Sequence, residues 1–307
     1  MLSRVAERIY WMSRYLERAE NGARLVRAYG ELLLDLPEEA GLDWSLALRI
    51  LGMDDDPARG AAVDDFEFLL CHPGHAGSLL SSLGLARENA RTTRDLLPSE
   101  AWQAINELHL YARARLPALA VDGQGGRVPA EIVSQCHEIT GILEGTMSHG
   151  PAHQFVRLGR YLERADMTSR MIDVAAAIMM TGQEELRLYG NGIWRAVLRA
   201  LSAFQMYRQH VRRRINGPDV LRFLLLDQQF PRAVLFCVGQ LGEAAAALPR
   251  SAVALQSVAG LRDSLSRMDL ETTTYAKVHG DVDELQQELA ELHGSIADTW
   301  LSPMRIS

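Results

Sequence analysis

Apolar residues recur at spacings of three and four positions along almost the whole chain, whereas strand-like alternation is scarce. This period matches a helix with one buried face, so the pattern predicts helices throughout. Proline and glycine mark the breaks. Two long helices are expected, one over residues 3–35 and one over 152–181. Shorter helices are expected over residues 43–51, 63–71, 78–96, 98–116, 130–147, 192–214, 219–227, 231–247, 251–277 and 282–301.

These helices predict an all-α fold, a large multi-helix bundle. An internal repeat adds detail, because the heptapeptide RYLERAE at residues 14–20 returns as RYLERAD at residues 160–166. The likeness continues downstream with a growing offset, as loop insertions between duplicated halves would produce. We therefore predict a single domain over residues 1–307 with a pseudo-twofold axis. Its halves would cover about 1–121 and 150–307, joined by a linker and a helix over 122–149.

The repeated segment places charged residues in one stripe along each long helix. The stripes consist of Arg14, Glu17, Asn21 and Arg24 in the first helix, and of Arg160, Glu163 and Arg170 in the second. As exposed surface pairs they would contribute only about 0.3–0.5 kcal/mol each. Residue-by-residue repetition instead favours a buried network, in which every donor and acceptor needs a partner. The stripes predict either a structural lock between the halves or a polar cavity that binds an ion or substrate.

Composition narrows the possible chemistry. Of the 32 lysines and arginines, Lys277 is the only lysine, so 31 are arginines. This disfavours Schiff-base and P-loop chemistry, while arginine forks suit carboxylates and phosphates. The net charge of −7 gives no reason to expect nucleic-acid or anionic-membrane binding. Three scattered cysteines and a charged N-terminal segment predict a cytoplasmic protein, and the longest apolar run is too short to span a membrane.

Two histidine-rich segments have metal-like crowding, namely residues 72–75 (HPGH) and 149–153 (HGPAH). Both lie at helix breaks, and without further ligands we interpret them as loop or capping histidines. No histidine has a glutamate three residues before it, which argues against a di-iron bundle. Nucleotide-binding, hydrolase and metalloprotease motifs do not occur in the sequence. We therefore expect neither a metal nor a cofactor.

The sequence resembles the bacterial alpha-E domain family, helical proteins named for a Glu-Arg motif, over nearly its whole length. The resemblance is carried by residues 8–21 (RIYWMSRYLERAEN), 86–91 (ARENAR), 159–166 (GRYLERAD) and 223–227 (FLLLD) followed by Pro231-Arg232. It implies a helical fold and an association with ATP-grasp-type carboxylate–amine ligases and transglutaminase-like proteins, beside or fused to which family members tend to be encoded. It implies no catalytic residues. One departure is Ala233, where a serine is expected.

The candidate substrate-binding residues are Arg14, Glu17, Arg18, Asn21, Arg24, Glu88, Asn89, Arg91, Arg160, Glu163, Arg164, Asp166, Arg170, Asp227 and Arg232. The arginines would hold carboxylate or phosphate groups, and the acidic residues would orient them or bind an amine. The leading hypothesis is a non-catalytic partner of an ATP-grasp-type ligase that binds or presents a carboxylate-bearing peptide or amino acid. One alternative is an enzyme that uses paired carboxylates in a central cleft, a transferase or ligase-like protein. The other is a purely structural scaffold.

Overall fold

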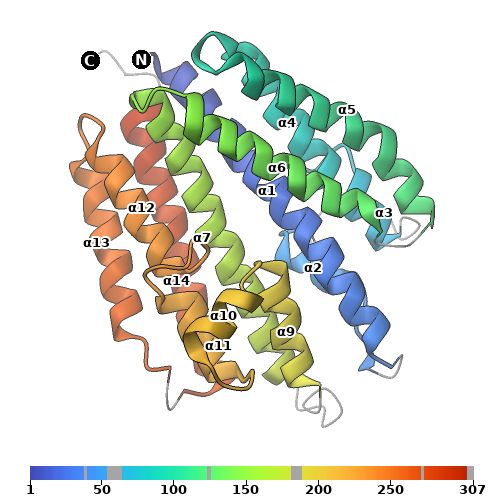
Figure 1. Ribbon diagram of the computed structural model, residues 1–307. Helices are drawn as coiled ribbons and strands as arrows, with labels where there is room; N and C mark the ends of the chain where they lie inside the picture. Colours follow the sequence, from blue (N-terminus) through green and yellow to red (C-terminus); the bar gives the residue numbers. More distant parts are fainter. Residues whose placement is uncertain (38–39, 54–63, 123–125, 181–188, 271–272, 303–307) are drawn as a thin grey trace.

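A computed structural model describes residues 1–37, 40–53, 64–122, 126–180, 189–270 and 273–302 (Figure 1). The described chain is all-α and contains no strand, as predicted. Its elements are α1 (Ser3–Asp35), α2 (Ser45–Ile50), α3 (Asp65–Cys71), α4 (Leu79–Thr92), η2 (Arg94–Leu96), α5 (Ser99–Asp122), α6 (Arg127–Thr146), α7 (Pro151–Met180), α9 (Gly190–Ala200), α10 (Phe204–Val211), α11 (Gly217–Leu226), α12 (Val234–Ala246), α13 (Ala252–Arg267), α14 (Tyr275–Ile296) and η3 (Ala297–Leu301).

The two long helices α1 and α7 pack against each other at the centre of the molecule (Figure 1). Their backbones approach so closely at Gly159 that a Cβ atom there would lie 2.3 Å from the carbonyl oxygen of Tyr10. Ser13 strengthens the crossing, since its hydroxyl donates a hydrogen bond to the Val156 carbonyl at 2.7 Å. A glycine on α7 thus sets how near the two charged stripes can come.

The remaining helices surround this pair in two similar sets. Helices α4, α5 and α6 form successive contacts beside α1, and α12, α13 and α14 do the same beside α7. Short helices cross over, because α9 packs on α1 while α2 packs on α7. The downstream likeness of the two halves pairs Trp44 with Trp194, and these tryptophans lie at corresponding places, in the turn before α2 and in α9. This arrangement suits duplicated halves, and the duplication itself stays a prediction.

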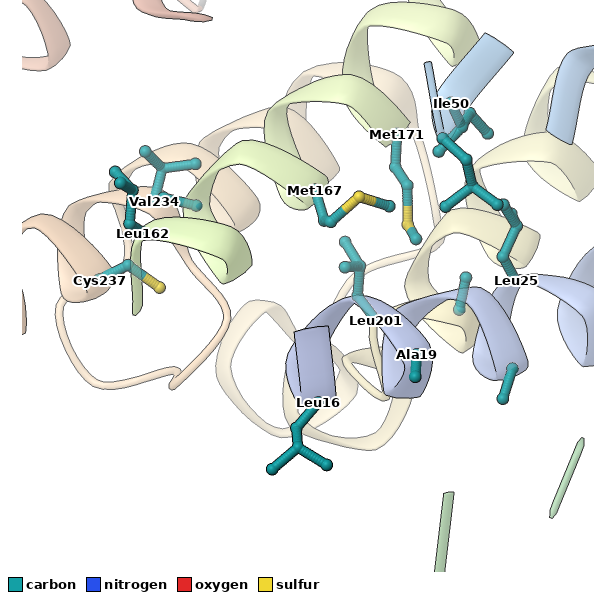
Figure 2. Close-up of a cluster of buried hydrophobic side chains, with 14 of the residues drawn as sticks. Leu16, Ala19, Leu25, Ile50, Leu162, Met167, Met171, Leu201, Val234 and Cys237 are labelled. Atoms are coloured by element: carbon teal, nitrogen blue, oxygen red, sulfur yellow. The ribbon is translucent and has the colours of Figure 1, made fainter. Parts of the chain in front are cut away.

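Apolar side chains fill the space around the charged stripes (Figure 2). Leu16 and Leu25 of α1 and Met167 and Met171 of α7 are buried, as is Leu201 beyond α9. The flanks of both long helices are therefore buried, and Glu17 and Glu163 of the two stripes lie in the interface between the helices. None of the described helices combines the length and apolar character needed to cross a membrane.

Several expected boundaries were wrong. The helix expected over 192–214 is interrupted between α9 and α10, where Ser202 adopts a left-handed conformation with φ 51°. The helix expected over 251–277 ends at Arg267, and α14 begins at Tyr275 rather than 282, because the Thr274 hydroxyl caps it. Helix α5 continues through Pro117 to Asp122. Of the expected linker, residues 123–125 lie outside the described residues.

Candidate functional site: a buried Glu-Arg cluster

The two Glu-Arg motifs face each other across the α1–α7 interface and exchange partners. Glu17 accepts hydrogen bonds from Nε and Nη2 of Arg164 at 2.9 and 2.7 Å. Glu163 accepts them from Nε and Nη2 of Arg18 at 2.5 and 3.1 Å. Each glutamate therefore receives both prongs of the arginine fork from the other half, the strongest geometry for such a pair. The same two residue types in each half build both sides of one reciprocal contact.

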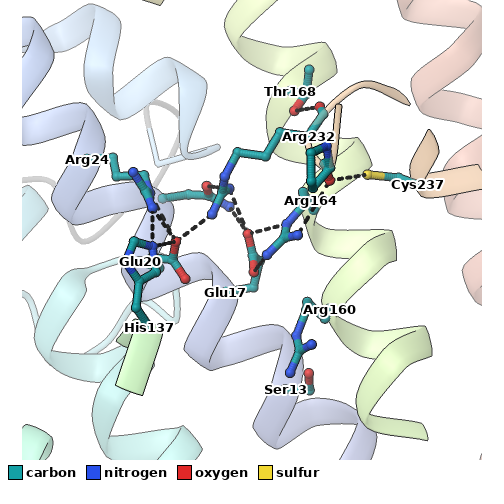
Figure 3. Close-up of polar contacts among 12 residues, drawn as sticks. Ser13, Glu17, Glu20, Arg24, His137, Arg160, Arg164, Thr168, Arg232 and Cys237 are labelled. Carbon is teal, nitrogen blue, oxygen red and sulfur yellow. Dashed lines mark hydrogen bonds and ion pairs between the residues drawn. The ribbon is translucent and has the colours of Figure 1, made fainter. Parts of the chain in front are cut away.

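Further arginines complete this contact, and Figure 3 shows the part of it around Glu17, Glu20 and Arg232. Arg14 adds a hydrogen bond from Nε to Glu163 at 2.6 Å. Arg232, in the segment before α12, donates to Glu17 at 2.8 Å, to Asn21 at 2.6 Å and to Glu20 at 2.5 Å. The Thr168 hydroxyl donates to the Arg232 carbonyl at 2.9 Å, which fixes this segment against α7. We call Arg14, Glu17, Arg18, Glu20, Asn21, Arg24, Glu163, Arg164 and Arg232 the Glu-Arg cluster.

One edge of the cluster reaches the surface. Arg24 binds Glu20 through Nε and Nη2 at 3.0 and 2.7 Å, and it also contacts Ser202 and His137. The His137 side chain is 58% exposed, whereas the Glu20 side chain is 3% exposed. The cluster therefore runs from a closed centre at Glu17 and Glu163 to a solvent-facing end at His137.

Burial and charge act in opposite directions on the glutamates. Burial alone would raise the pKa of Glu163, but Arg14 and Arg18 outweigh it and lower the pKa to about 2. The same balance lowers the pKa of Glu17, through Arg164 and Arg232. Both carboxylates stay ionised at neutral pH, so they act as fixed anions that hold arginines. Five arginines face three glutamates, so the cluster carries an excess of positive charge.

The centre of the cluster has no room for a substrate. Its cavity measures about 10 Å³ and is lined by Glu17, Glu20, Arg160 and neighbouring apolar residues. That is about the space of a single water molecule. A larger hollow of about 470 Å³ lies at the solvent-facing end, between α1 and the α9–α10 segment. Its lining includes Arg24, Arg27, Ser202 and the ion pair of Arg199 with Glu31, whose charged groups lie 3.0 Å apart.

The structure brings some sequence-predicted residues together and leaves others apart. Eight belong to the cluster, namely Arg14, Glu17, Arg18, Asn21, Arg24, Glu163, Arg164 and Arg232. The other seven lie outside it, namely Glu88, Asn89, Arg91, Arg160, Asp166, Arg170 and Asp227. Asp166 and Arg170 pair with each other along α7 at 3.0 Å. Arg160 binds Glu144 of α6 at 2.5 Å.

The second Glu-Asn pair of the sequence, Glu88-Asn89 on α4, remains on the surface. Glu88 and Arg91 pair at 2.8 Å with side chains 55% and 52% exposed, and Asn89 donates to the Leu85 carbonyl at 2.9 Å. Asp227 caps a turn by accepting from the backbone N–H groups of Gln229 and Phe230 at 2.8 and 2.7 Å. These contacts are local.

Sequence reasoning left Glu20, His137 and Ser202 out of the site. Glu20 carried a signal, because it ends the first copy of the repeated heptapeptide where Asp166 ends the second. His137 and Ser202 belong to no repeated motif, and only packing of α6 and α9 beside α1 brings them to Arg24.

The departure at Ala233 concerns the start of a helix. Ala233 precedes α12 and has no side chain able to cap it. At the matching place before α4, the Ser78 hydroxyl accepts a hydrogen bond from the Ser81 N–H at 3.3 Å. The serine expected at position 233 would therefore serve as a helix cap there.

The fork geometry predicts that lysine cannot replace arginine within the cluster. We expect Arg164→Lys to lower the free energy of unfolding by roughly 1.5–3 kcal/mol, because an ammonium group cannot hold both Glu17 oxygens at once. The control is Arg212→Lys, since exposed Arg212 makes only a hydrogen bond to the Gln209 carbonyl. Urea unfolding followed by circular dichroism measures both. Equal tolerance at the two positions would contradict the prediction.

The sequence is similar to a described protein family and to several longer proteins. A family model described as a predicted alpha-helical domain with a conserved ER motif matches residues 1–301. Uncharacterized proteins of Mycobacterium bovis and of two Mycobacterium tuberculosis strains are 24% identical over 321 residues. The match covers 96% of this chain and 36% of each relative, so the chain spans about a third of their length. No solved structure matches the chain.

Proposed function

The chain belongs to the Alpha-E family, and we propose that it is a non-catalytic helical partner of an ATP-grasp-type ligase in a peptide- or amide-bond-forming system. The proposal rests on the observation that the Glu-Arg cluster is buried and its glutamates are paired. Glu17 and Glu163, the glutamates of the repeated motif, are paired with arginines and only 3% and 1% exposed. In this role the motif locks α1 to α7 and so fixes the surface that the ligase would contact.

An enzyme using these carboxylates finds less support. A general acid or base must reach the substrate, and its pKa works best near the operating pH. Glu163 has a pKa of about 2 and donates or accepts no proton at neutral pH. The cavity of about 10 Å³ beside Glu17 admits no amino acid. The geometry therefore favours a structural motif over a catalytic one.

The lengths of the relatives support a partner role. This chain matches only 36% of each mycobacterial relative, so the helical domain there shares a polypeptide with other segments. A domain that occurs within longer chains is suited to act together with another domain. The ATP-grasp-type identity of that partner comes from the family association of the sequence motifs.

The hollow at the end of the cluster supports the substrate-presenting part of the proposal. Arg27 is exposed there, whereas Arg24 is paired with Glu20 and Arg199 with Glu31. Arginine forks bind carboxylates bidentately, and the excess positive charge of the cluster lies directly behind them. A carboxylate-bearing peptide or amino acid is the ligand class that this lining would attract.

The partner role is tested with an ATP-grasp-type carboxylate–amine ligase from the same organism. The two purified proteins are mixed at micromolar concentration and separated by gel filtration, and we expect one peak that contains both. Clean separation would overturn the proposal. The matched variants Glu163→Gln and Glu88→Gln test the enzyme alternative in an amide-bond-forming assay with the ligase. If Glu163→Gln keeps its fold but abolishes amide formation, and Glu88→Gln does not, an enzyme is the better explanation.

The hollow is tested with a glutamate dipeptide as the probe in a calorimetric titration. We expect Arg27→Gln to weaken its binding, whereas Arg250→Gln, which lies outside the hollow, should not. If the two variants bind the dipeptide equally well, the hollow is not a substrate site, and only the contact with the ligase remains proposed.

A further inference from the structure

The corner between α6 and α7 gathers three side chains that can ligate a metal ion. Glu144 lies in the last turn of α6, His149 in the connecting turn and His153 in the first turn of α7. One ligand atom from each of these three residues lies within 4.8 Å of the others. The two histidines belong to the HGPAH segment, and the fold supplies the third residue that their sequence spacing lacks.

The imidazole rings are aligned toward Glu144. They stack with centroids 4.1 Å apart and planes 6° from parallel. Nε2 of His153 lies 3.3 Å from the carboxylate oxygen Oε2 of Glu144, and Nε2 of His149 lies 3.3 Å from the Glu144 carbonyl oxygen. Among the described residues, the buried Nδ1 of His153 has no hydrogen-bond partner, so the polar contact that orients this ring is the one from Nε2 to Glu144. Both Nε2 atoms therefore converge on one residue.

We propose that His149, His153 and Glu144 bind a divalent transition metal ion of the zinc class. Two imidazoles and one carboxylate form a zinc ligand set, with a fourth position left for water. Ligand atoms around tetrahedral zinc at 2.0–2.2 Å are about 3.3–3.6 Å apart, so separations of up to 4.8 Å must shorten by roughly 1–1.5 Å. One of the two stacked rings must also turn out of its parallel plane before both ring nitrogens can face the same ion. His149 and Glu144 are exposed, and such rotations meet little obstruction.

Arg160 prepares the carboxylate for this role. Its Nη1 donates to Oε1 of Glu144 at 2.5 Å, which leaves Oε2 turned toward His153. Ligating carboxylates commonly have a partner of this kind, because it fixes the orientation of the ligand atom. This contact also explains why Arg160, the counterpart of Arg14 in the repeat, lies outside the Glu-Arg cluster.

The two helix ends act in opposite directions on a cation at this corner. The C-terminal carbonyls of α6 carry partial negative charge and favour a cation near Glu144, whereas the N-terminus of α7 carries partial positive charge and disfavours one. The proposal therefore rests on the ligand set, in which Glu144 supplies the negative charge.

A second group, Asp173, His279 and Asp283, serves as a comparison. Its single histidine contacts Asp173. With one imidazole instead of two, this group is the weaker zinc site.

The test uses tag-free protein, Zn²⁺ in a calorimetric titration and Co²⁺ as a visible-absorption probe. We expect one Zn²⁺ per chain and the absorption bands of four-coordinate Co²⁺ with histidine ligands. His149→Ala and Glu144→Gln alter exposed side chains, so the fold should survive. Each should weaken Zn²⁺ binding by roughly tenfold or more, since a lost ligand costs at least as much as a lost supporting contact.

His279→Ala is the matched control and should bind Zn²⁺ like the unmodified protein. The proposal is overturned if the unmodified protein shows neither Zn²⁺ binding nor Co²⁺ bands. It is equally overturned if both His149→Ala and Glu144→Gln keep full affinity, or if His279→Ala alone loses it.

Discussion

Glu17→Gln is expected to lower the free energy of unfolding by roughly 3–5 kcal/mol, the usual cost of removing one partner from a buried ion pair. The substitution preserves the shape of the side chain but leaves Arg164 and Arg232 without the charge that both contact. Arg232 is buried, and its burial already lowers its pKa. Urea unfolding monitored by circular dichroism gives the free energy, and the midpoint should fall sharply.

Glu88→Gln is the matched control for this experiment. It removes the same charge from another Glu-Arg pair, whose side chains are 55% and 52% exposed. Exposed pairs contribute about 0–1 kcal/mol, so the change should be small. If Glu17→Gln unfolds at the same urea concentration as Glu88→Gln, the cluster does not act as a lock.

Gly159→Ala is expected to cost roughly 1–3 kcal/mol or more, because overpacking at a tight interface forces the backbone to move. The added methyl would lie 2.3 Å from the Tyr10 carbonyl oxygen and 3.1 Å from the Ser13 Cβ. The carbonyl belongs to the backbone of α1 and cannot turn aside. Separation of α1 from α7 would in turn stretch the Arg164–Glu17 contact.

Gly141→Ala makes the same chemical change in an open position. Gly141 lies within α6, is exposed and has no atom within 4 Å of the added methyl. Alanine favours helix over glycine by about 1 kcal/mol, so this variant should be more stable than the unmodified protein. Thermal unfolding of both variants decides the matter: a stabilised Gly159→Ala would exclude close approach at the α1–α7 crossing.

The long helices and the fold class could be predicted because their signals are local and repeated. A three- and four-residue apolar period over 30 positions leaves little alternative to a helix. The break near Ser202 could not be predicted, since its left-handed backbone occurs at a residue that has no strong turn preference. Pro117 was expected to end a helix at residue 116, but α5 continues past it to Asp122. Tertiary packing outweighed local preference at both sites.

The sequence indicated many of the residues that gather in the Glu-Arg cluster, but it did not indicate which of them bind each other. Repetition singled out Glu17 and Glu163, but a sequence cannot show that each binds the arginine of the other copy. It also gave the α4 motif equal weight, although Glu88 lies on the surface. Residues such as His137 join only because α6 packs on α1. The spacing of residues along one helix predicts that they share a face. Which helix packs against that face depends on the fold.

The exchange of partners also bears on how the protein is made. Glu17 emerges early from the ribosome, whereas Arg164 follows 147 residues later and Arg232 follows 215 residues later. At translation rates of about 5–20 residues per second, Glu17 waits roughly 10–40 s for its last partner. Until Arg164 is synthesised, Glu17 lacks both arginines that bind it in the folded protein, whereas Glu20 already has Arg24 beside it. We therefore expect a gene divided between the halves to encode two chains that are each less stable without the other.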